Sequence, residues 1–267
     1  MTKLAKFTLK HKKLLFFTPT IALGVVWGFL SDLGYITIPI WIETIIWVAF
    51  VISITLLTHT LPIVYLTKKP QSELFDNCDP EPYFNITKEL LTYNLSYTDH
   101  LATLLDYCVT LRDMGGIQEA YDMLSVINID KKASTPNVFK AIYYNNLADV
   151  CWLLGDNAAA DIWCEKMLRI YQDMPQSKFR KHLDSTALIS SAEKSYRNED
   201  YSMAMLTLNQ AELKNTRAKV SAALLRAQIY IKAGNMENAR KELDYVISNG
   251  NKCYDVTRAK EILNNID

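Results

Sequence analysis

Two long apolar runs near the N-terminus set the strongest limit on what this chain folds into. Residues 14–30 read LLFFTPTIALGVVWGFL and contain no ionisable side chain. Residues 44–66 read TIIWVAFVISITLLTHTLPIVYL, and His59 is their only group that titrates near neutral pH. A helix needs about 20 apolar residues to cross the hydrocarbon core of a bilayer. Because backbone groups inside lipid must be hydrogen-bonded within the chain, both runs are predicted to be transmembrane helices.

A cleaved signal peptide is the alternative interpretation of the first run, since basic residues precede it. The run is longer than the apolar core of most signal peptides, and no small-x-small cleavage pattern occurs in residues 31–35. The second run also comes too soon for an exported soluble domain. We therefore expect residues 1–67 to form a retained membrane anchor with two spans.

The lysines predict the orientation of this anchor. Residues 31–43, between the two runs, contain no lysine, whereas lysines flank the anchor on its other side at Lys3, Lys6, Lys10, Lys12, Lys13, Lys68 and Lys69. Positive residues concentrate on the cytoplasmic side of membrane proteins. We expect a multi-pass protein of the cell membrane with both termini and the rest of the chain in the cytoplasm, and with Tyr35 and Trp41 at the outer interface. His59 is interpreted as an interfacial residue rather than a proton or ligand site, since no intramembrane carboxylate accompanies it.

The rest of the chain consists of an acidic segment followed by a slightly basic one. Residues 70–130 carry 11 acidic and two basic side chains, whereas residues 131–267 carry 20 basic and 16 acidic ones. A zero formal charge over the whole chain argues against a nucleic-acid-binding protein. The basic groups at 178–181 and at Lys214, Arg217 and Lys219 are expected to be solvated, with contact to anionic lipid as the alternative. Five widely spaced cysteines predict free thiols rather than a disulfide framework.

Residues 68–84 separate the anchor from the C-terminal part of the chain. This stretch reads KKPQSELFDNCDPEPYF, with three prolines and four acidic residues. Such a composition predicts an irregular connector, followed by a short helix around residues 87–93. Residues 68–96 are therefore expected to form an acidic linker with one short helix.

From Tyr97 onward the chain repeats itself. Four segments each contain an apolar helix, a turn and a second helix with an alanine at a fixed place. The turns read MGGIQEA (114–120), LGDNAAA (154–160), NEDYSMA (198–204) and AGNMENA (233–239). Three of them carry a glycine five residues before the final alanine, and the third carries Glu199 there. Helix pairs of this kind bury their apolar faces by stacking.

The repeats resemble the tetratricopeptide repeat (TPR) over residues 97–247, and the whole chain resembles a bacterial-type, membrane-anchored member of that family. The second unit carries the fullest match, at Tyr144, Leu147, Ala148, Cys151, Gly155, Ala160, Cys164 and Met167. The resemblance implies an all-α fold, in which about four hairpins stack into a right-handed α-solenoid over residues 97–267 and residues 254–266 form a capping helix. A generic array of helical hairpins is the alternative.

The resemblance also implies a concave groove, lined by the first helix of each hairpin, that receives a protein or peptide partner. The groove residues it implies are Arg112, Asn145, Asn146, Asp149, Trp152, Glu193, Tyr196, Arg197 and Gln228, together with Leu105, Asp106, Val109, Ile189, Leu224 and Ile231. Trp152 and Tyr196 would form two aromatic walls, and Asn145 and Asn146 would hydrogen-bond the backbone of an extended peptide. The lysines with which chaperone-binding members hold a terminal carboxylate are absent.

No motif for chemistry accompanies these repeats. The sequence lacks HExxH, GxxxxGK[ST] and GxGxxG, and no Cys/His pair has metal-ligand spacing. We therefore expect no catalytic residue, no metal site and no cofactor. The sequence predicts a membrane-tethered scaffold rather than an enzyme. The alternative is an accessory or peptide-sensing subunit of a membrane transporter or export complex, whose transmembrane hairpin packs against partner helices.

Overall fold

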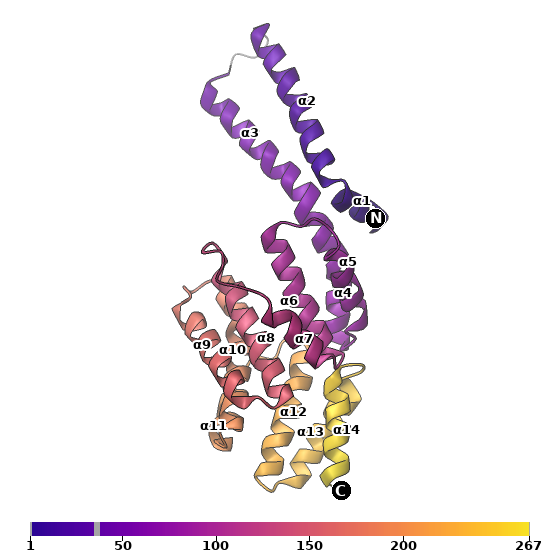
Figure 1. Ribbon diagram of the computed structural model, residues 1–267, viewed down its shortest axis with the longest axis vertical. Helices are drawn as coiled ribbons and strands as arrows, with labels where there is room; N and C mark the ends of the chain where they lie inside the picture. The colour runs from indigo at the N-terminus through magenta and orange to yellow at the C-terminus, as the bar shows by residue number, and fades with distance from the viewer. Residues whose placement is uncertain (1, 35–37, 267) are drawn as a thin grey trace. The chain divides into compact units, whose positions relative to one another are not determined.

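The computed structural model describes residues 2–34 and 38–266, apart from the side chains of His59 and His182, and within these ranges all regular structure is helical (Figure 1). The all-α prediction is confirmed. The chain divides into two compact units, one made of residues 1–69 and 89–96 and the other of residues 70–88 and 97–267. The predicted place of Tyr35 lies outside the described residues.

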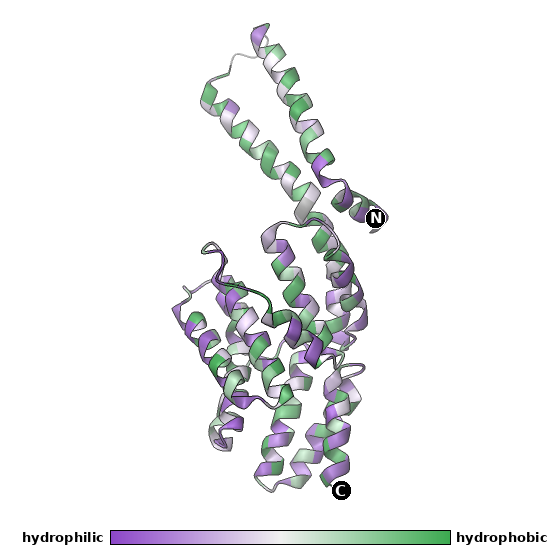
Figure 2. Ribbon diagram, in the orientation of Figure 1, coloured by the Kyte–Doolittle hydropathy of each residue, from purple (hydrophilic) through white to green (hydrophobic). Residues whose placement is uncertain are grey.

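The first unit contains the apolar helices. Its helices are α1 (Thr2–Lys10), α2 (Lys12–Asp32), α3 (Ile40–Thr55), the π-helical turn η1 (Leu56–Thr60) and the beginning of α4 (Leu61–Asn77). Helix α2 and the continuous stretch Ile40–Asn77 are each long and apolar enough to cross a membrane. Figure 2 shows that hydrophobic residues predominate along α2 and α3. Within this unit Trp27 Nε1 donates a 2.7 Å hydrogen bond to Glu43 Oε1, which joins α2 to α3.

The prediction of an irregular connector after the second apolar run is wrong. Helix α4 continues through Pro70 to Asn77, and α5 (Glu81–Leu90) begins after three residues. A proline inside a helix removes one backbone donor. Helix α4 nevertheless continues past Pro70, and Leu74, one turn later, is fully buried. Pro82 stands at the second position of α5, where the backbone N–H would have no helical partner anyway. The boundary between the two units falls within α4, between Lys69 and Pro70.

The second unit consists mainly of four helical hairpins and a final helix. Their bounds are α6 (Tyr97–Asp113) with α7 (Ile117–Ser125), α8 (Asn137–Leu154) with α9 (Asn157–Asp173), α10 (Lys178–Arg197) with α11 (Tyr201–Asn209), α12 (Thr216–Lys232) with α13 (Met236–Asn249), and α14 (Tyr254–Ile266). Each hairpin packs on the next one along the chain. These are the four helix pairs and the closing helix that the repeated turns predict.

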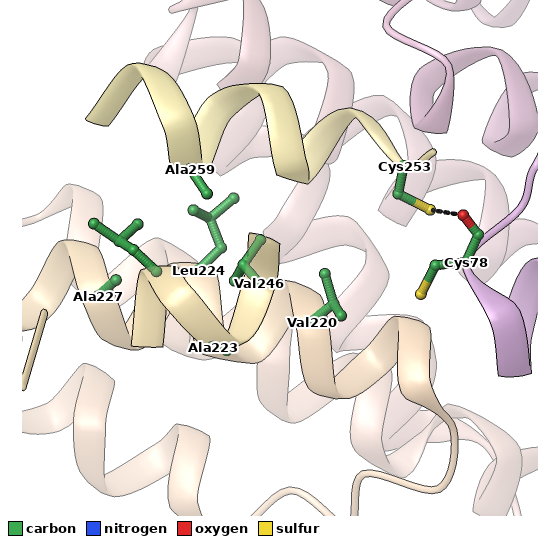
Figure 3. Close-up of a cluster of buried hydrophobic side chains, with 9 residues drawn as sticks. Cys78, Val220, Ala223, Leu224, Ala227, Val246, Cys253 and Ala259 are labelled. Carbon is green, nitrogen blue, oxygen red and sulfur yellow. Dashed lines mark hydrogen bonds between the residues drawn. The ribbon is translucent and has the colours of Figure 1, made fainter. Parts of the chain in front are cut away.

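Small residues bring the paired helices together. The four alanines that follow the turns are fully buried, as are three alanines on the first helices; they are Ala120, Ala160, Ala204, Ala239, Ala148, Ala192 and Ala227. Most of them belong to the hydrophobic cores of their hairpins, and the last of these cores is drawn in Figure 3. Larger side chains at these positions would hold the helices apart, because protein interiors are close-packed.

One residue in each of the four turns adopts the same left-handed backbone conformation. Gly115, Gly155 and Gly234 have φ angles of 87°, 83° and 74°, and Glu199 has a φ of 63°. This left-handed conformation at a helix end suits glycine and is costly for other residues. The second helix then begins with a side-chain cap in three hairpins, where Asp156, Asp200 and Asn235 accept from the backbone N–H three residues later.

The first and last parts of the second unit are in contact. A Cβ added to Gly115 in the first turn would lie 3.0 Å from Tyr254 Cδ2 at the start of α14. The backbone N–H of Lys252 donates to the Cys78 carbonyl at 3.2 Å, and the Cys253 thiol donates to the same oxygen at 3.4 Å (Figure 3). In an open stack each repeat contacts only its neighbours. In this chain the end of α4, the first hairpin and α14 close the array.

Candidate functional site

The second unit contains an open cavity of about 650 Å³. Its wall is formed by the first helix of every hairpin, namely α6, α8, α10 and α12. Residues of α14, the end of α4, Tyr83 of α5 and the connections before α12 and α14 also contribute to it. The second helices of the hairpins contribute none of the lining residues. The volume lies within the range of about 300–1,000 Å³ that is usual for ligand pockets.

Most of the residues predicted to line a groove do line this cavity. They are Asp106, Val109, Arg112, Asn145, Asn146, Asp149, Trp152, Ile189, Glu193, Arg197, Leu224 and Gln228. Helical spacing explains the agreement, since residues three, four and seven apart share one face of a helix. Whether these side chains bind a partner stays a prediction.

Three predicted residues are placed elsewhere. Leu105, Tyr196 and Ile231 are absent from the cavity wall. The Tyr196 ring lies 5.9 Å from the ring of Tyr201 and packs in the core of its own hairpin. The cavity therefore has Trp152 from the predicted aromatic pair and lacks Tyr196.

A buried group of four charges forms one part of the wall. Asp113 accepts from Arg112 at 2.8 Å and from Arg217 Nη2 at 2.9 Å, and Arg112 also pairs with Asp149. Burial would raise the pKa of Asp113, but the two arginines bring that pKa below its usual value. Burial raises the pKa of Asp149, against the opposing effect of Arg112. Two cations and two anions make the group neutral as a whole.

Arg217 and Asp113 were not predicted to belong to the site. The sequence placed Arg217 in a solvated basic run, whereas its side chain is 18% exposed and its guanidinium lies 5.7 Å from the centre of the Phe75 ring. The prediction is wrong because the run coincides with the N-terminus of α12, which faces the cavity. Asp113 lies seven residues after Asp106 on α6, so helical spacing alone would have placed it on the same face.

The two predicted peptide-binding amides are engaged within the protein. Ser190 Oγ donates to Asn145 Oδ1 at 2.6 Å, and Asn145 Nδ2 donates to Asp149 at 3.3 Å. Asn146 Nδ2 lies 3.5 Å from the Leu105 carbonyl oxygen that accepts from it. Both asparagines are buried and join neighbouring helices, so their structural contacts compete with the expected role in binding a peptide backbone.

Two further ion pairs lie on α10 and α14 in the wall. Arg197 donates to Glu193 at 2.7 Å on α10, and Arg258 donates to Asp255 at 3.3 Å on α14. Asp255 also accepts from Ser221 on α12 at 2.8 Å. These contacts hold polar side chains in fixed positions around the cavity.

Asp106 has a different environment. It accepts a 2.6 Å hydrogen bond from the Tyr83 hydroxyl, and no basic side chain among the described residues pairs with it. Burial raises the pKa of Asp106 to about 6, although the hydrogen bond from Tyr83 acts in the opposite direction. Trp152, which is 4% exposed, has an indole N–H without an acceptor in the described part of the chain.

The described residues contain no group of three or more His, Cys, Asp and Glu side chains arranged to hold a metal ion. The cavity is therefore a mixed polar and apolar space, distinguished by its ion pairs and by Asp106. In comparisons with known proteins, the chain matches no family model, no curated protein and no solved structure.

Proposed function

We propose that this protein is a membrane-tethered scaffold whose TPR-like helical-repeat domain binds a protein or peptide partner in its cavity. The observation that carries the proposal is the cavity itself, walled by one helix from each of four successive hairpins. In a stacked array the same face of each repeat is presented to one space. The volume of the cavity, about 650 Å³, suits a short segment, such as an extended peptide or a protein terminus.

Exposed apolar helices support the membrane anchor. Side chains such as Val25, Phe29 and Ile40 are 67%, 64% and 81% exposed on α2 and α3. Apolar surface of this extent is stable in lipid and unfavourable in water. The lysines on one side of the hairpin then favour a cytoplasmic repeat domain, in the cell membrane, by the tendency of positive residues to remain inside.

The pairing of charges supports binding rather than catalysis. Arg112, Asp113, Asp149 and Arg217 neutralise one another inside the wall, and a general acid or base must be free to exchange a proton with a substrate. Anchoring at a membrane raises the local concentration of two partners, so a modest affinity is sufficient for recruitment.

A second function is favoured by one feature of the first unit. The π-helical turn η1 at Leu56–Thr60 interrupts an otherwise continuous helix, and such turns are frequently found at functional sites. An anchor with a role of its own fits an accessory subunit whose helices pack against those of a transporter or export complex.

Site-directed crosslinking tests the proposed function. A photoreactive amino acid at Ile142, a half-buried cavity residue, is compared with the same amino acid at Met203, which is 47% exposed on α11 and outside the cavity. We expect adducts with one short polypeptide segment at position 142 and none of these at 203, as identified by mass spectrometry. Equal labelling at both positions would contradict the proposal.

Replacement of the anchor separates the two functions. When an unrelated two-span anchor replaces residues 1–67, a scaffold retains its adduct at position 142, whereas an accessory subunit loses it. Protease digestion tests the orientation. We expect the repeat domain to be cut in inverted vesicles and protected in intact cells.

A further inference from the structure

The cavity wall contains one acidic group that the protein itself leaves without a counter-ion. Five of the six acidic residues on the wall pair with arginine or lysine; these are Asp113, Asp149, Glu193, Glu212 and Asp255. The sixth is Asp106, whose one hydrogen-bond partner among the described residues is the neutral Tyr83 hydroxyl. A carboxylate in a partly desolvated place is costly unless a cation joins it.

The geometry of Asp106 leaves room for such a cation. The Tyr83 hydroxyl occupies Oδ2 at 2.6 Å, and Oδ1 has no donor in the described ranges of the chain. A carboxylate accepts several hydrogen bonds, and an ammonium group has three donors to offer. A cation at Oδ1 would therefore complete the hydrogen bonding of Asp106 without displacing Tyr83.

Apolar side chains on α6 and α8 share the cavity wall with Asp106. Val109 lies one turn further along α6, and Val138 and Ile142 stand on α8; all three line the cavity. Apolar side chains on a cavity wall gain free energy when a ligand covers them, at roughly 25 cal/mol for each Å² removed from water. The ligand that fits is therefore cationic at one end and apolar beside it.

A second polar group without a hydrogen-bond partner among the described residues lies on the same wall. The indole N–H of Trp152 is buried and has no acceptor within the described residues. Leaving a buried donor unpaired costs about 1–3 kcal/mol. A peptide carries both groups that the wall lacks, because its terminal ammonium is followed by backbone carbonyls that accept hydrogen bonds.

We propose that the cavity binds the free amino terminus of a short apolar peptide, with the terminal ammonium on Asp106. This inference rests on the proposed function, since it names the occupant of the same cavity. The proposed ligand is the N-terminal ammonium of a peptide and not another organic cation. A small organic diamine shares the charge but has neither the backbone carbonyl nor the apolar side chains.

Calorimetry with the full chain in lipid nanodiscs tests the inference. Three probes are used: a pool of C-terminally amidated tetrapeptides built from Ala, Val, Leu and Phe, the same pool acetylated at its amino termini, and cadaverine. We expect the free pool to bind about tenfold to a hundredfold more tightly than the acetylated pool, as for a hydrogen bond to a charged group. Cadaverine is expected to bind more weakly than the free pool.

Two variants assign the effect to Asp106. Asp106→Asn keeps the shape and an acceptor for Tyr83 but removes the charge, so its affinity for the free pool should fall to that for the acetylated pool. Glu237→Gln is the control, because the Glu237 carboxylate on α13 is 81% exposed and does not line the cavity. It should change the affinity less than about twofold. Circular dichroism establishes that both variants are folded.

The outcomes separate the two proposals. Equal affinity for free and acetylated pools, or an unchanged affinity in Asp106→Asn, overturns the amino-terminal inference and leaves a peptide cavity in place. Tighter binding of cadaverine than of the free pool overturns it in favour of an organic cation. Binding of none of the three probes by the folded protein overturns both the inference and the proposal that the cavity binds short peptides.

Discussion

Asp113, the last residue of α6, accepts hydrogen bonds from Arg217 at the start of α12, 104 residues further along the chain. The contact joins the first hairpin to the fourth. Arg112 shares the same carboxylate, so one buried anion holds two guanidinium groups. The closure of the array therefore depends on a carboxylate that cations from two different hairpins share.

Removing the shared carboxylate should destabilise the closed array. In Asp113→Ala, the guanidinium of Arg217 loses its carboxylate partner in a buried place, and breaking one side of a buried ion pair costs about 3–5 kcal/mol. We expect a loss of that order in the free energy of unfolding, measured by urea denaturation of the full chain in detergent. Glu237→Ala is the control, since the Glu237–Lys241 pair is exposed and should contribute nothing measurable. Equal stability of the two variants would contradict a structural role for the closure.

The third turn should become more stable when its residue is changed to the glycine of the other turns. Glu199 has a φ of 63°, and the left-handed conformation costs a non-glycine residue about 1–2 kcal/mol. Part of this gain is lost because glycine is more flexible in the unfolded chain. Glu199→Gly is therefore expected to raise the free energy of unfolding by about 0.5–1 kcal/mol, as measured by urea denaturation.

The reverse change in the second turn is the control for Glu199. Gly155 has a φ of 83° with no atom within 4 Å of an added Cβ, so Gly155→Ala introduces backbone strain without a clash. It should lower the free energy of unfolding by about 1 kcal/mol. Changes of the same sign in the two variants would show that the left-handed backbone is not the cause.

Stability should depend on pH through Asp106. The pKa of Asp106 is raised to about 6 in the folded protein by burial, against 3.8 ordinarily. A raised pKa means that the folded state disfavours the ionised form, so this group costs nothing below about pH 4 and destabilises the protein progressively as pH rises through about 6. Asp106→Asn should therefore be more stable than the unaltered protein by about 2–3 kcal/mol at about pH 8 and nearly equal to it at about pH 4. Urea denaturation at the two pH values measures the difference, and a constant difference would refute the assignment.

Three of the five cysteine thiols, those of Cys108, Cys151 and Cys164, should be unreactive in the folded protein. All five cysteines are buried and free, and burial raises the pKa of Cys108 and Cys164 to about 12 and that of Cys151 to about 11. Since the thiolate is the reactive form, Ellman's reagent at about pH 8 should label these three only after denaturation. Glu237→Cys supplies an exposed thiol as the control. Rapid labelling of Cys108, Cys151 or Cys164 in the native protein would contradict their burial.

Local structure is the part of this fold that the sequence predicts best. The spacing from turn to alanine identifies all four hairpins. Each hairpin needs a left-handed residue in its turn and a buried alanine where its two helices meet, and neither depends on contacts with other hairpins. Even Glu199, which departs from the glycine pattern, adopts the conformation of the glycines. The face of each first helix follows from helical periodicity, so twelve of the fifteen predicted groove residues line the cavity.

Long-range structure was not predicted. No periodicity within α6 or α12 indicates that Asp113 and Arg217 meet, since the contact depends on the accumulated rotation of four hairpins. Tyr196 was misplaced for a related reason, because its ring turns toward Tyr201 within its own hairpin. The prolines after the apolar run predicted a break, but α4 continues through Pro70 to Asn77.

Closure also fixes the copy number of the repeats. A stack that is open at both ends tolerates the gain or loss of a unit, because only adjacent units touch. In this chain an inserted or deleted hairpin would separate Arg217 from Asp113. The two charged side chains would then lack this ion pair. The contact between the first and fourth hairpins therefore constrains the number of units between them.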